Sequence, residues 1–328
     1  MIKTVTLTFA LFFAYSVVYG QHWQVENLKR KIALSSDDSS KVNLLADLSY
    51  RYTNIDIDSA ILFAQTGISL GKNIRYQHGE ASCLISLGRA YMHFGNNDLA
   101  LERMMDALQI LEKLKFQKEK GLAIINIALV YAYLQNAPLS LNYALRAKKI
   151  AEEINDRSLL VVCLLKLCDL YEYANKADSG LIMANLAKRI SIELKDTSSW
   201  ARSLVYIGFA HYKLGDILTD IYYKQESLRL NLANGDNRSA AQNYLSIAES
   251  YAEDNKIDSA LYFANKSLNL AEKHHFAFIA MSGLSTLSYL YEGQNDKKAL
   301  HYYKLFKEAN DSFSLHTGRI KLIIHSLQ

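Results

Sequence analysis

The sequence contains very few residues that interrupt helices. Proline occurs once in 328 residues, at Pro138, and glycine occurs only 14 times. Because these two residues are the strongest helix breakers, their scarcity favours long uninterrupted helices, and Ala, Leu, Glu and Lys recur at helical spacing throughout. Strand signals are nearly absent. The sequence therefore predicts an all-α protein.

Cysteine is also scarce, with three residues in the whole chain. Cys163 and Cys168 are five positions apart, which is roughly 140° around a helix, so they point to different faces. Cys83 lies far away in the sequence. We expect all three to be small buried apolar residues rather than parts of a disulfide framework.

An excess of one charge is missing as well. The chain has 37 Lys and Arg against 33 Asp and Glu, for a formal net charge of +4, and the basic residues are scattered. Binding of a phosphate backbone needs a basic stripe. The composition therefore predicts no nucleic-acid partner.

Signatures of catalysis and of metal binding are lacking. The sequence has no glycine-rich phosphate loop and no Cys/His set with metal-ligand spacing. The one tempting pair, His274 and His275, is adjacent, and adjacent side chains on a helix diverge by about 100°. We therefore expect no enzyme, no metal and no cofactor, and we keep an enzyme as a remote alternative.

The first twenty residues differ from the rest. Lys3 provides a basic start, residues 5–18 are mostly apolar, and compact residues precede Gln21. This pattern predicts a secretory signal peptide at residues 1–20, cleaved near Gly20-Gln21, and export to the periplasm or the extracellular space. The apolar run is shorter than the roughly 20 residues that span a membrane. The alternatives are an uncleaved anchor or a buried helix.

A pattern of three residues recurs about every forty positions. An aliphatic residue is followed by a small residue and, four positions after the aliphatic one, by a ring. The aliphatic residues are Leu48, Leu87, Ile127, Leu167, Ile207, Ile247 and Leu287. The rings are Tyr52, Tyr91, Tyr131, Tyr171, His211, Tyr251 and Tyr291. This spacing places the aliphatic residue and the ring on one helical face, with room for a close helix neighbour.

A second helical pattern follows each ring after a turn rich in Asn, Asp and Gly. It includes the near-identical octapeptides "IDSAILFA" at Ile57–Ala64 and "IDSALYFA" at Ile257–Ala264, five periods apart. We expect Asp58 and Asp258 to cap these helices. We expect the small residues to let the two helices approach, and the ring to fill the space toward the next unit. Stacked units then bury each other's apolar faces.

The combination of "LGRAY" with Ala100 and Ala107 resembles the tetratricopeptide repeat. The resemblance covers residues 41 to about 310 and implies a right-handed superhelix of about seven helix-turn-helix repeats. Two departures are the forty-residue period and the absence of the proline that usually closes the second helix, and both fit longer second helices. The fifth repeat deviates internally, with His211 as its ring and Asp220 at a small position, which hints at a kink or a site.

The predicted organisation has four parts. Residues 1–20 are the signal peptide, 21–40 an N-terminal cap helix, 41–312 seven repeats, and 313–328 a C-terminal amphipathic helix that is a cap or the start of a linker. The stretch "RIKLIIHSLQ" carries an apolar stripe for that helix.

The resemblance also implies where a partner would bind. In such repeats the first helix of each unit lines the concave face, at positions two and five residues after the aliphatic one. These are Tyr50 and Thr53, Arg89 and Met92, Leu129 and Ala132, Asp169 and Glu172, Phe209 and Tyr212, Glu249 and Ala252, and Tyr289 and Glu292. A row of aromatic and charged residues suits a protein or peptide partner, and the alternative is an unselective solvated surface.

We therefore predict a non-catalytic, exported solenoid that binds a protein, a peptide or a small ligand on its concave face. The signal peptide followed by long repeats resembles the extracytoplasmic input region of bacterial sensor kinases and transcription regulators. On that reading the chain is a sensory region. Otherwise it is a stand-alone secreted or periplasmic scaffold, and a membrane is involved only through an uncleaved leader or a downstream span.

Overall fold

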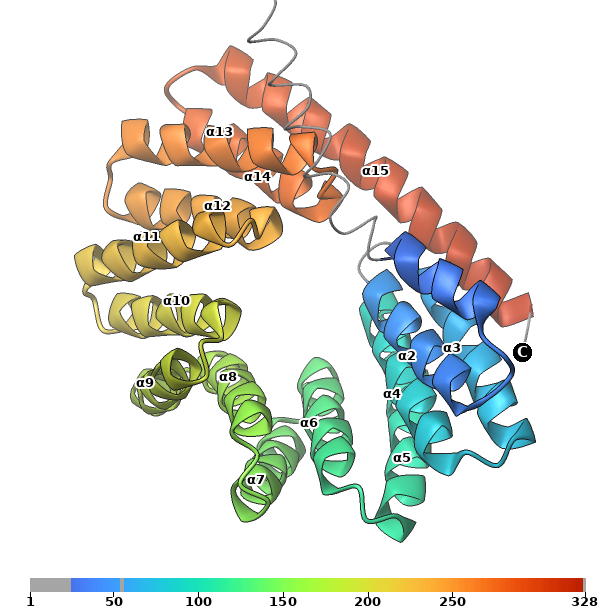
Figure 1. Ribbon diagram of the computed structural model, residues 1–328. Helices are drawn as coiled ribbons and strands as arrows, with labels where there is room; N and C mark the ends of the chain where they lie inside the picture. The colour runs from blue at the N-terminus through green and yellow to red at the C-terminus, as the bar shows by residue number, and fades with distance from the viewer. Residues whose placement is uncertain (1–24, 54–55, 327–328) are drawn as a thin grey trace, which may run out of the picture. The chain divides into compact units, whose positions relative to one another are not determined.

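The computed structural model describes residues 25–53 and 56–326, with side chains as far as Asp311, and every element in this part of the chain is a helix. Residues 25–34 form the first helix. The others, labelled in Figure 1, are α2 (Ser39–Tyr52), α3 (Ile57–Asn73), α4 (Gln77–Phe94), α5 (Asn97–Lys113), α6 (Gln117–Tyr133), α7 (Ala137–Glu153), α8 (Arg157–Tyr173), α9 (Ala177–Glu193), α10 (Thr197–Lys213), α11 (Ile217–Ala233), α12 (Asn237–Glu253), α13 (Ile257–Lys273), α14 (Ala277–Tyr291) and α15 (Asp296–Ser326).

From α2 to α15, the helices form seven consecutive pairs, which confirms the all-α repeat prediction. The forty-residue period is visible in α8 and α9, each of 17 residues, because α10 begins forty residues after α8. The sequence predicted that only the second helices would be long. The structure corrects this for the pairs from α6 to α13, in which the first helix is as long as the second and a three-residue link joins them.

The links repeat as regularly as the helices. Asn175, Lys195 and Gly215 each have positive φ, and they lie twenty residues apart. After α9 the Asp196 N–H donates to the Ser191 carbonyl at 2.9 Å, which closes the helix as a left-handed C-terminal cap does. The Asp196 side chain then accepts from the Ser199 N–H at 3.0 Å and caps α10. One short link therefore ends one helix and starts the next.

The small positions let the two helices of a pair approach closely, as predicted. Ser49 Oγ donates to the Ala60 carbonyl at 2.8 Å, and Ser288 Oγ donates to the Ala299 carbonyl at 3.0 Å. At Gly88 an added Cβ would lie 3.0 Å from the Ala100 carbonyl oxygen, which leaves little room for a side chain. The repeated small residues are therefore contact points between backbones.

The repeated ring contacts a ring on the second helix of its own pair, a contact that the sequence analysis did not predict. Tyr131 stacks on Tyr143 with ring centroids 5.4 Å apart, and Tyr251 stacks on Phe263 at the same separation. His211 keeps this role in the fifth repeat, because it stacks on Tyr223 at 5.9 Å. In these pairs the ring therefore adds an aromatic contact between the two helices.

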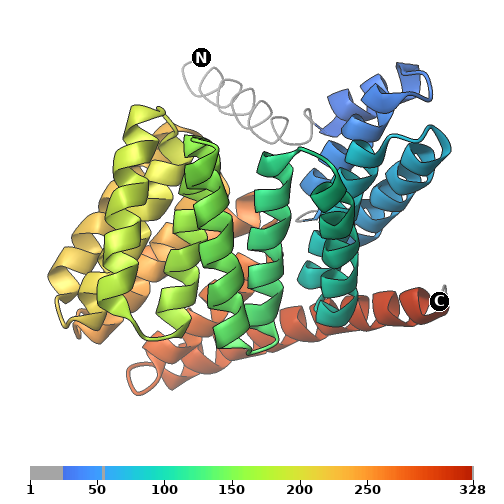
Figure 2. The same ribbon diagram turned by 90° about the horizontal axis from the view of Figure 1, so that it is seen from below.

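The chain divides into two compact units, Met1–Ile150 and Ala151–Gln328, and the boundary falls inside α7. Unit 1 contains α2 to α6 and most of α7. Its packing is seen in a cluster of Ala81, Leu84, Ala107, Leu111 and Ala123, which joins α4, α5 and α6. Unit 2 contains α8 to α15, in which each helix packs against the next (Figure 2).

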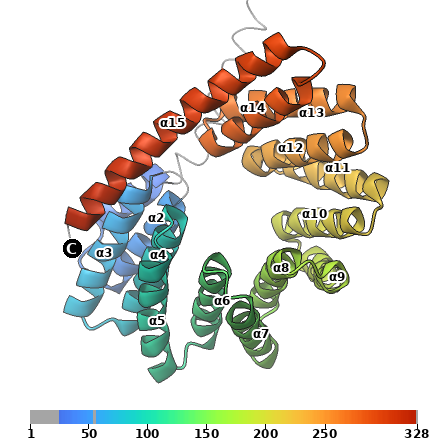
Figure 3. The same ribbon diagram turned by 180° about the vertical axis from the view of Figure 1, so that it is seen from behind.

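In unit 2 the first helices also contact the first helices of neighbouring pairs. Helix α10 packs on α8, and α12 packs on α14 (Figure 3). A core of Val161, Leu164, Leu165, Ala187 and Ile190 joins α8 to α9. Helix α11 packs against both α10 and α12, and in the described part of the chain no direct packing of α10 on α12 accompanies it.

Several smaller expectations can be checked. Asp58 and Asp258 lie inside the first turns of α3 and α13, where neither is the capping residue, so the prediction that they cap was wrong. A carboxylate there still favours the positive helix terminus. The three cysteines are buried and, in the described part of the chain, form no disulfide. Desolvation raises the pKa of Cys83 and of Cys168 to about 12, so these thiols stay protonated.

The ends of the chain add three facts. Residues 313–326 continue α15 without a break, so this stretch extends the second helix of the seventh pair. The predicted signal peptide lies outside the described residues. Within the described ranges, we find no helix that is both long and apolar enough to cross a membrane.

Candidate ligand-binding cavity

Unit 2 has an open cavity of about 710 Å³ on its first helices. Helices α8, α10 and α12, the first helices of three successive pairs, form its walls, and Ser227 and Asn231 of α11 also line it. A volume of this size is typical of a site for a small molecule or a short segment of chain. In unit 2 these three first helices therefore line a hollow.

The cavity-lining residues occupy the same positions of the repeat in each wall. Counted from the repeated aliphatic residue, the wall of α10 presents Arg202 at −5 and Tyr206 at −1, and the wall of α12 presents Gln242 and Ser246 at these two positions. In α8 the position −1 is Lys166. Because 3.6 residues make a turn, these positions form one stripe along each helix.

Asp169 is the centre of a charged network in this cavity. Its carboxylate accepts from Lys166 Nζ at 3.1 Å and from Arg202 Nη2 at 3.4 Å, and the Tyr206 hydroxyl also donates to it. Arg202 donates in turn to the Tyr206 oxygen at 3.2 Å. Desolvation raises the pKa of Tyr206 well above its usual value, so the hydroxyl keeps its proton. Both cations that line the cavity are thus paired with Asp169.

Two glutamates in the cavity have no such partner. Glu172 and Glu249 make no ion pair or hydrogen bond with another described side chain. Desolvation raises the pKa of Glu172, and the negative charge of Asp169 raises it further. Desolvation also raises the pKa of Glu249, while the Lys224 ammonium opposes that change. These two carboxylates remain without a matching positive charge in direct contact.

A buried ion pair lies beside the cavity. Asp220 is completely buried and Lys224 is 5% exposed, and Lys224 Nζ donates to Asp220 Oδ2 at 2.8 Å. Ser250 Oγ of α12 accepts from Lys224 Nζ at 2.8 Å and donates to the same carboxylate oxygen at 2.5 Å. The other oxygen of Asp220 has no partner. The deviation that the sequence shows at Asp220 therefore corresponds to a buried polar group that joins the fifth and sixth repeats.

Buried amides extend this polar region. Asn243 is 6% exposed, and its side-chain amide hydrogen-bonds the Ser227 hydroxyl at 2.7 Å. Asn231 is 5% exposed and lines the cavity, but its side chain makes no hydrogen bond within the described part of the protein. A side-chain amide offers both a hydrogen-bond donor and an acceptor to its surroundings. Asn231 is thus available to a group that enters the cavity.

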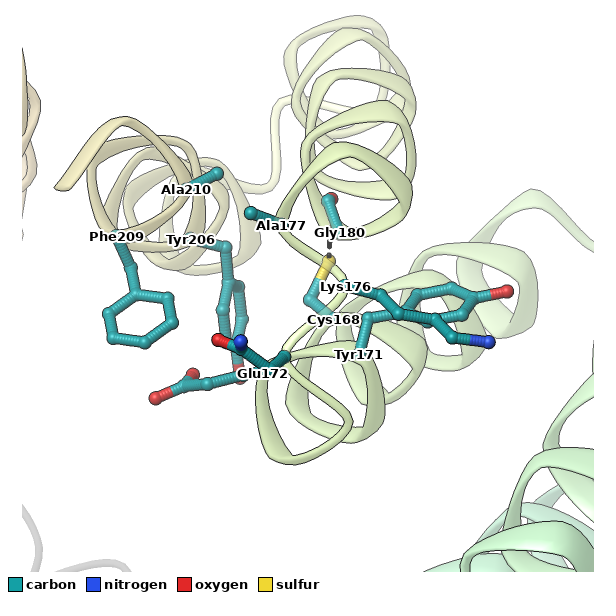
Figure 4. Close-up of a pocket in the computed structure, with 10 residues that line it drawn as sticks. Cys168, Tyr171, Glu172, Lys176, Ala177, Gly180, Tyr206, Phe209 and Ala210 are labelled. Carbon is teal, nitrogen blue, oxygen red and sulfur yellow. Dashed lines mark hydrogen bonds between the residues drawn. The ribbon is translucent and has the colours of Figure 1, made fainter. Parts of the chain in front are cut away.

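A smaller hollow of about 10 Å³ shares Glu172 and Tyr206 with the larger cavity. Figure 4 shows Phe209, Tyr206 and Glu172 close together, and the Cys168 sulfur directed at Gly180. The sulfur donates to the Gly180 carbonyl at 3.6 Å. Because the hollow has room for about one water molecule, it carries no ligand of its own. It places an aromatic wall beside Glu172.

The predicted site residues fall into three groups. Asp169, Glu172 and Glu249 line the large cavity, and Phe209 lines the small hollow. The Tyr212 ring lies 6.1 Å from that of Phe209, and Lys213 lies over both rings. These residues of unit 2 are brought together. Tyr289 is exposed in α14 and Glu292 follows it at the end of that helix, and neither lines the cavity.

The predicted residues of unit 1 make a different arrangement. Arg89 lies over the exposed Tyr50 ring, with its guanidinium carbon 4.4 Å from the ring centroid. Met92 and Leu129 are half-buried, and Thr53, predicted to be exposed, is buried with its hydroxyl bonded to the Ser49 carbonyl at 3.2 Å. None of these side chains lines the cavity of unit 2.

The sequence reasoning missed most of the cavity. Lys166, Arg202 and Tyr206 were not predicted, nor were the buried amides Asn231 and Asn243. The wall residues lie at −5 and −1 of the repeat, one and two turns before the positions considered. Continuing the predicted stripe toward the start of each helix would have found them. Asn231 belongs to a second helix, and no repeat signal pointed to it.

Comparisons with known proteins agree with this architecture. No family model matches the chain, and no curated protein matches it. Among solved structures, a Rap protein complexed with competence and sporulation factor has a TM-score of 0.64 at 15% identity, over 98% of this chain and 93% of that one. NprR in complex with its cognate peptide NprX has a TM-score of 0.60 at 16% identity, again over 98% and 93%.

A third structure is a signal transduction ATPase with a tetratricopeptide repeat sensor, PH0952 from Pyrococcus horikoshii. Its TM-score is 0.64 at 19% identity, over 85% of this chain and 42% of that one, so this chain spans less than half of that protein. At these identities the likeness establishes the fold alone. Together with the seven registered helix pairs, it shows that the chain has the fold of a tetratricopeptide-repeat solenoid.

Proposed function

We propose that the protein is a non-catalytic repeat protein that binds a short peptide segment in the cavity of unit 2. The observation that carries this proposal is the 710 Å³ cavity, which three successive first helices line with polar side chains. Of the similar structures, NprR is in complex with its cognate peptide NprX, and a Rap protein is complexed with competence and sporulation factor. The NprR complex supports a peptide as the class of ligand to test first.

The groups in the cavity suit recognition better than catalysis. Its charged centre, Asp169, already accepts three hydrogen bonds, which fix its position. Within the described residues no His, Cys, Asp and Glu cluster has the geometry of a metal site, and neither histidine nor cysteine lines the cavity. A hydrolase or transferase activity that is lost when Glu172 or Glu249 is replaced would contradict this part of the proposal.

Export and a sensory role extend the proposal. The basic start and apolar run of residues 1–20 support a signal peptide, and hence a periplasmic or extracellular location. One similar structure has its tetratricopeptide repeats as the sensor of a signal transduction ATPase. We infer that peptide binding here serves as the input of a signalling protein, and the alternative is a free scaffold for assembling protein complexes. Sequencing the N-terminus of the exported protein tests the leader.

Binding can be tested with the full chain and a library of fluorescein-labelled, N-acetylated pentapeptide amides, read by fluorescence anisotropy. We expect some peptides to bind and Gln242→Trp, which fills the cavity from α12, to abolish that binding. Ser82→Trp places the same indole at the same repeat position in unit 1 and serves as the matched control. Absence of binding across the library, or equal loss with both variants, would contradict the proposal.

A further inference from the structure

The cavity of unit 2 has a surplus of negative charge. Its walls carry two cations, Lys166 and Arg202, and four carboxylates, Asp169, Glu172, Asp236 and Glu249, so their formal charge is −2. Asp169 is paired with both cations. Asp236 caps α12 by accepting from the Ser239 N–H at 3.0 Å, where the helix terminus favours a negative charge. The surplus therefore belongs to Glu172 and Glu249.

The neighbouring lysines do not neutralise these glutamates by contact. Lys213 acts on Glu172 through its charge, and its ammonium group lies over the Phe209 and Tyr212 rings. Lys224 acts on both glutamates through its charge, but its ammonium group is buried and already bonded to Asp220 and Ser250. Partly desolvated carboxylates without a bonded cation are unfavourable in an empty site. A positively charged group that enters the cavity would remove that cost.

A second, independent observation concerns Asn231. Asn231 is 5% exposed and lines the cavity from α11, and no described residue hydrogen-bonds its side chain. A side-chain amide offers both a donor and an acceptor, which matches the N–H and C=O of a peptide bond. It therefore points to a ligand that carries an amide as well as a charge.

Resting on the proposed function, we propose that the bound peptide carries a lysine or arginine side chain whose charge lies against Glu172 and Glu249, while Asn231 pairs with a peptide bond of its main chain. The aromatic wall of Tyr206 and Phe209 lies beside Glu172 and contacts the aliphatic stem of that side chain. The paired cations at Asp169 keep a peptide carboxylate from binding there, because their charge is already compensated.

The test uses the full chain and four N-acetylated, fluorescein-labelled pentapeptide amides that differ only at the third residue, which is lysine, arginine, norleucine or glutamate. We expect the lysine or arginine peptide to bind at least about tenfold more tightly than the norleucine peptide, and the glutamate peptide to bind most weakly. Comparison of the lysine and arginine arms identifies which cation the glutamates prefer.

Three variants locate the effect. Glu172→Gln and Glu249→Gln keep the shape of the side chains, and we expect each to remove most of the cationic preference while the norleucine peptide binds as before. Asn231→Leu should weaken all four peptides by a similar factor. Glu292→Gln, on an exposed carboxylate outside the cavity, is the matched control.

The possible failures can be told apart. Peptides that bind in the cavity with no preference for charge, or with a preference that survives both glutamine variants, would overturn this inference and leave the proposed function standing. If none of the four peptides binds, and none from the wider library does, both the inference and the proposed function fall.

Discussion

The two units are built on one repeat pattern but treat buried polar groups differently. In unit 1, Ser49, Ser86 and Ser140 are buried, and each hydroxyl donates to a main-chain carbonyl, at 2.8, 3.1 and 2.7 Å. In unit 2, Asp220 and Lys224 are buried against each other, and Asn231 has no bonded partner. Buried polar groups in unit 1 thus support helix packing, whereas several in unit 2 surround a cavity.

One repeat position shows how the difference arises. Ala60, Ala100 and Ala260 occupy the small position of the second helix, and all three are completely buried. At the same position the fifth repeat has Asp220, which needs Lys224 and Ser250 as partners. Gly208 faces it, and an added Cβ there would lie 3.0 Å from Asp220 Oδ1. At this position the fifth repeat therefore has a buried polar group in place of the small packing residue of the other repeats.

Lys224→Met should have the largest effect on stability. It leaves the Asp220 carboxylate buried without a cation, and we expect a loss of about 3–5 kcal/mol from the free energy of unfolding of unit 2. Urea denaturation followed by circular dichroism measures this loss.

The double variant Asp220→Ala with Lys224→Met is the control for this prediction. It restores the small residue of the other repeats and removes both charges, so its stability should be close to that of the natural protein or higher. A double variant as unstable as the single one would show that the pair is not the cause.

A smaller effect is expected from Asp169→Asn, which removes the charge that holds Lys166 and Arg202. Because this network is partly buried, we expect a loss of about 1–2 kcal/mol. Asp106→Asn breaks the exposed pair with Arg103 in unit 1 and should cost less than about 0.5 kcal/mol. Equal losses from the two variants would contradict the difference between the units.

The smallest effect concerns pH. In the folded protein the pKa values of Glu172 and Glu249 are raised above the ordinary value of 4.5. At a pH above 4.5 but below these raised pKa values, the folded protein therefore holds protons that the unfolded chain has released. The unfolding free energy therefore falls as pH rises through this range. The double variant Glu172→Gln with Glu249→Gln lacks this loss, and we expect its melting temperature to exceed that of the natural protein by about 1–2 °C near neutral pH. An advantage that does not shrink toward pH 4.5 would contradict the pKa shifts.

The fold was largely predictable because the same sequence pattern occurs in every repeat. Leu48, Leu167 and Leu287 recur in register and are all completely buried, so each copy confirmed the others. The length of the first helices was not predictable in the same way. The forty-residue period gives the combined length of the two helices and their links. Only the residues with left-handed backbone conformation in the links, such as Asn175 and Lys195, show where each helix ends.

The site was less predictable because it depends on differences between copies. The resemblance selected positions that include Asp169, Glu172 and Glu249, and these residues do line the cavity. The same rule selected Thr53, which is buried, and Tyr289, which lies outside the cavity. The role of Asn231 depends on the packing of α11 between two first helices, and nothing in a single repeat encodes that packing.

The central claim is that the peptide ligand binds in the cavity of unit 2. Hydrogen–deuterium exchange of the full chain, with and without the tightest-binding lysine or arginine pentapeptide, tests it most directly. We expect the peptide to slow exchange in α8, α10 and α12 and in α11 near Asn231, and to leave α2 to α6 unchanged. Protection confined to α2 to α6 would contradict the account.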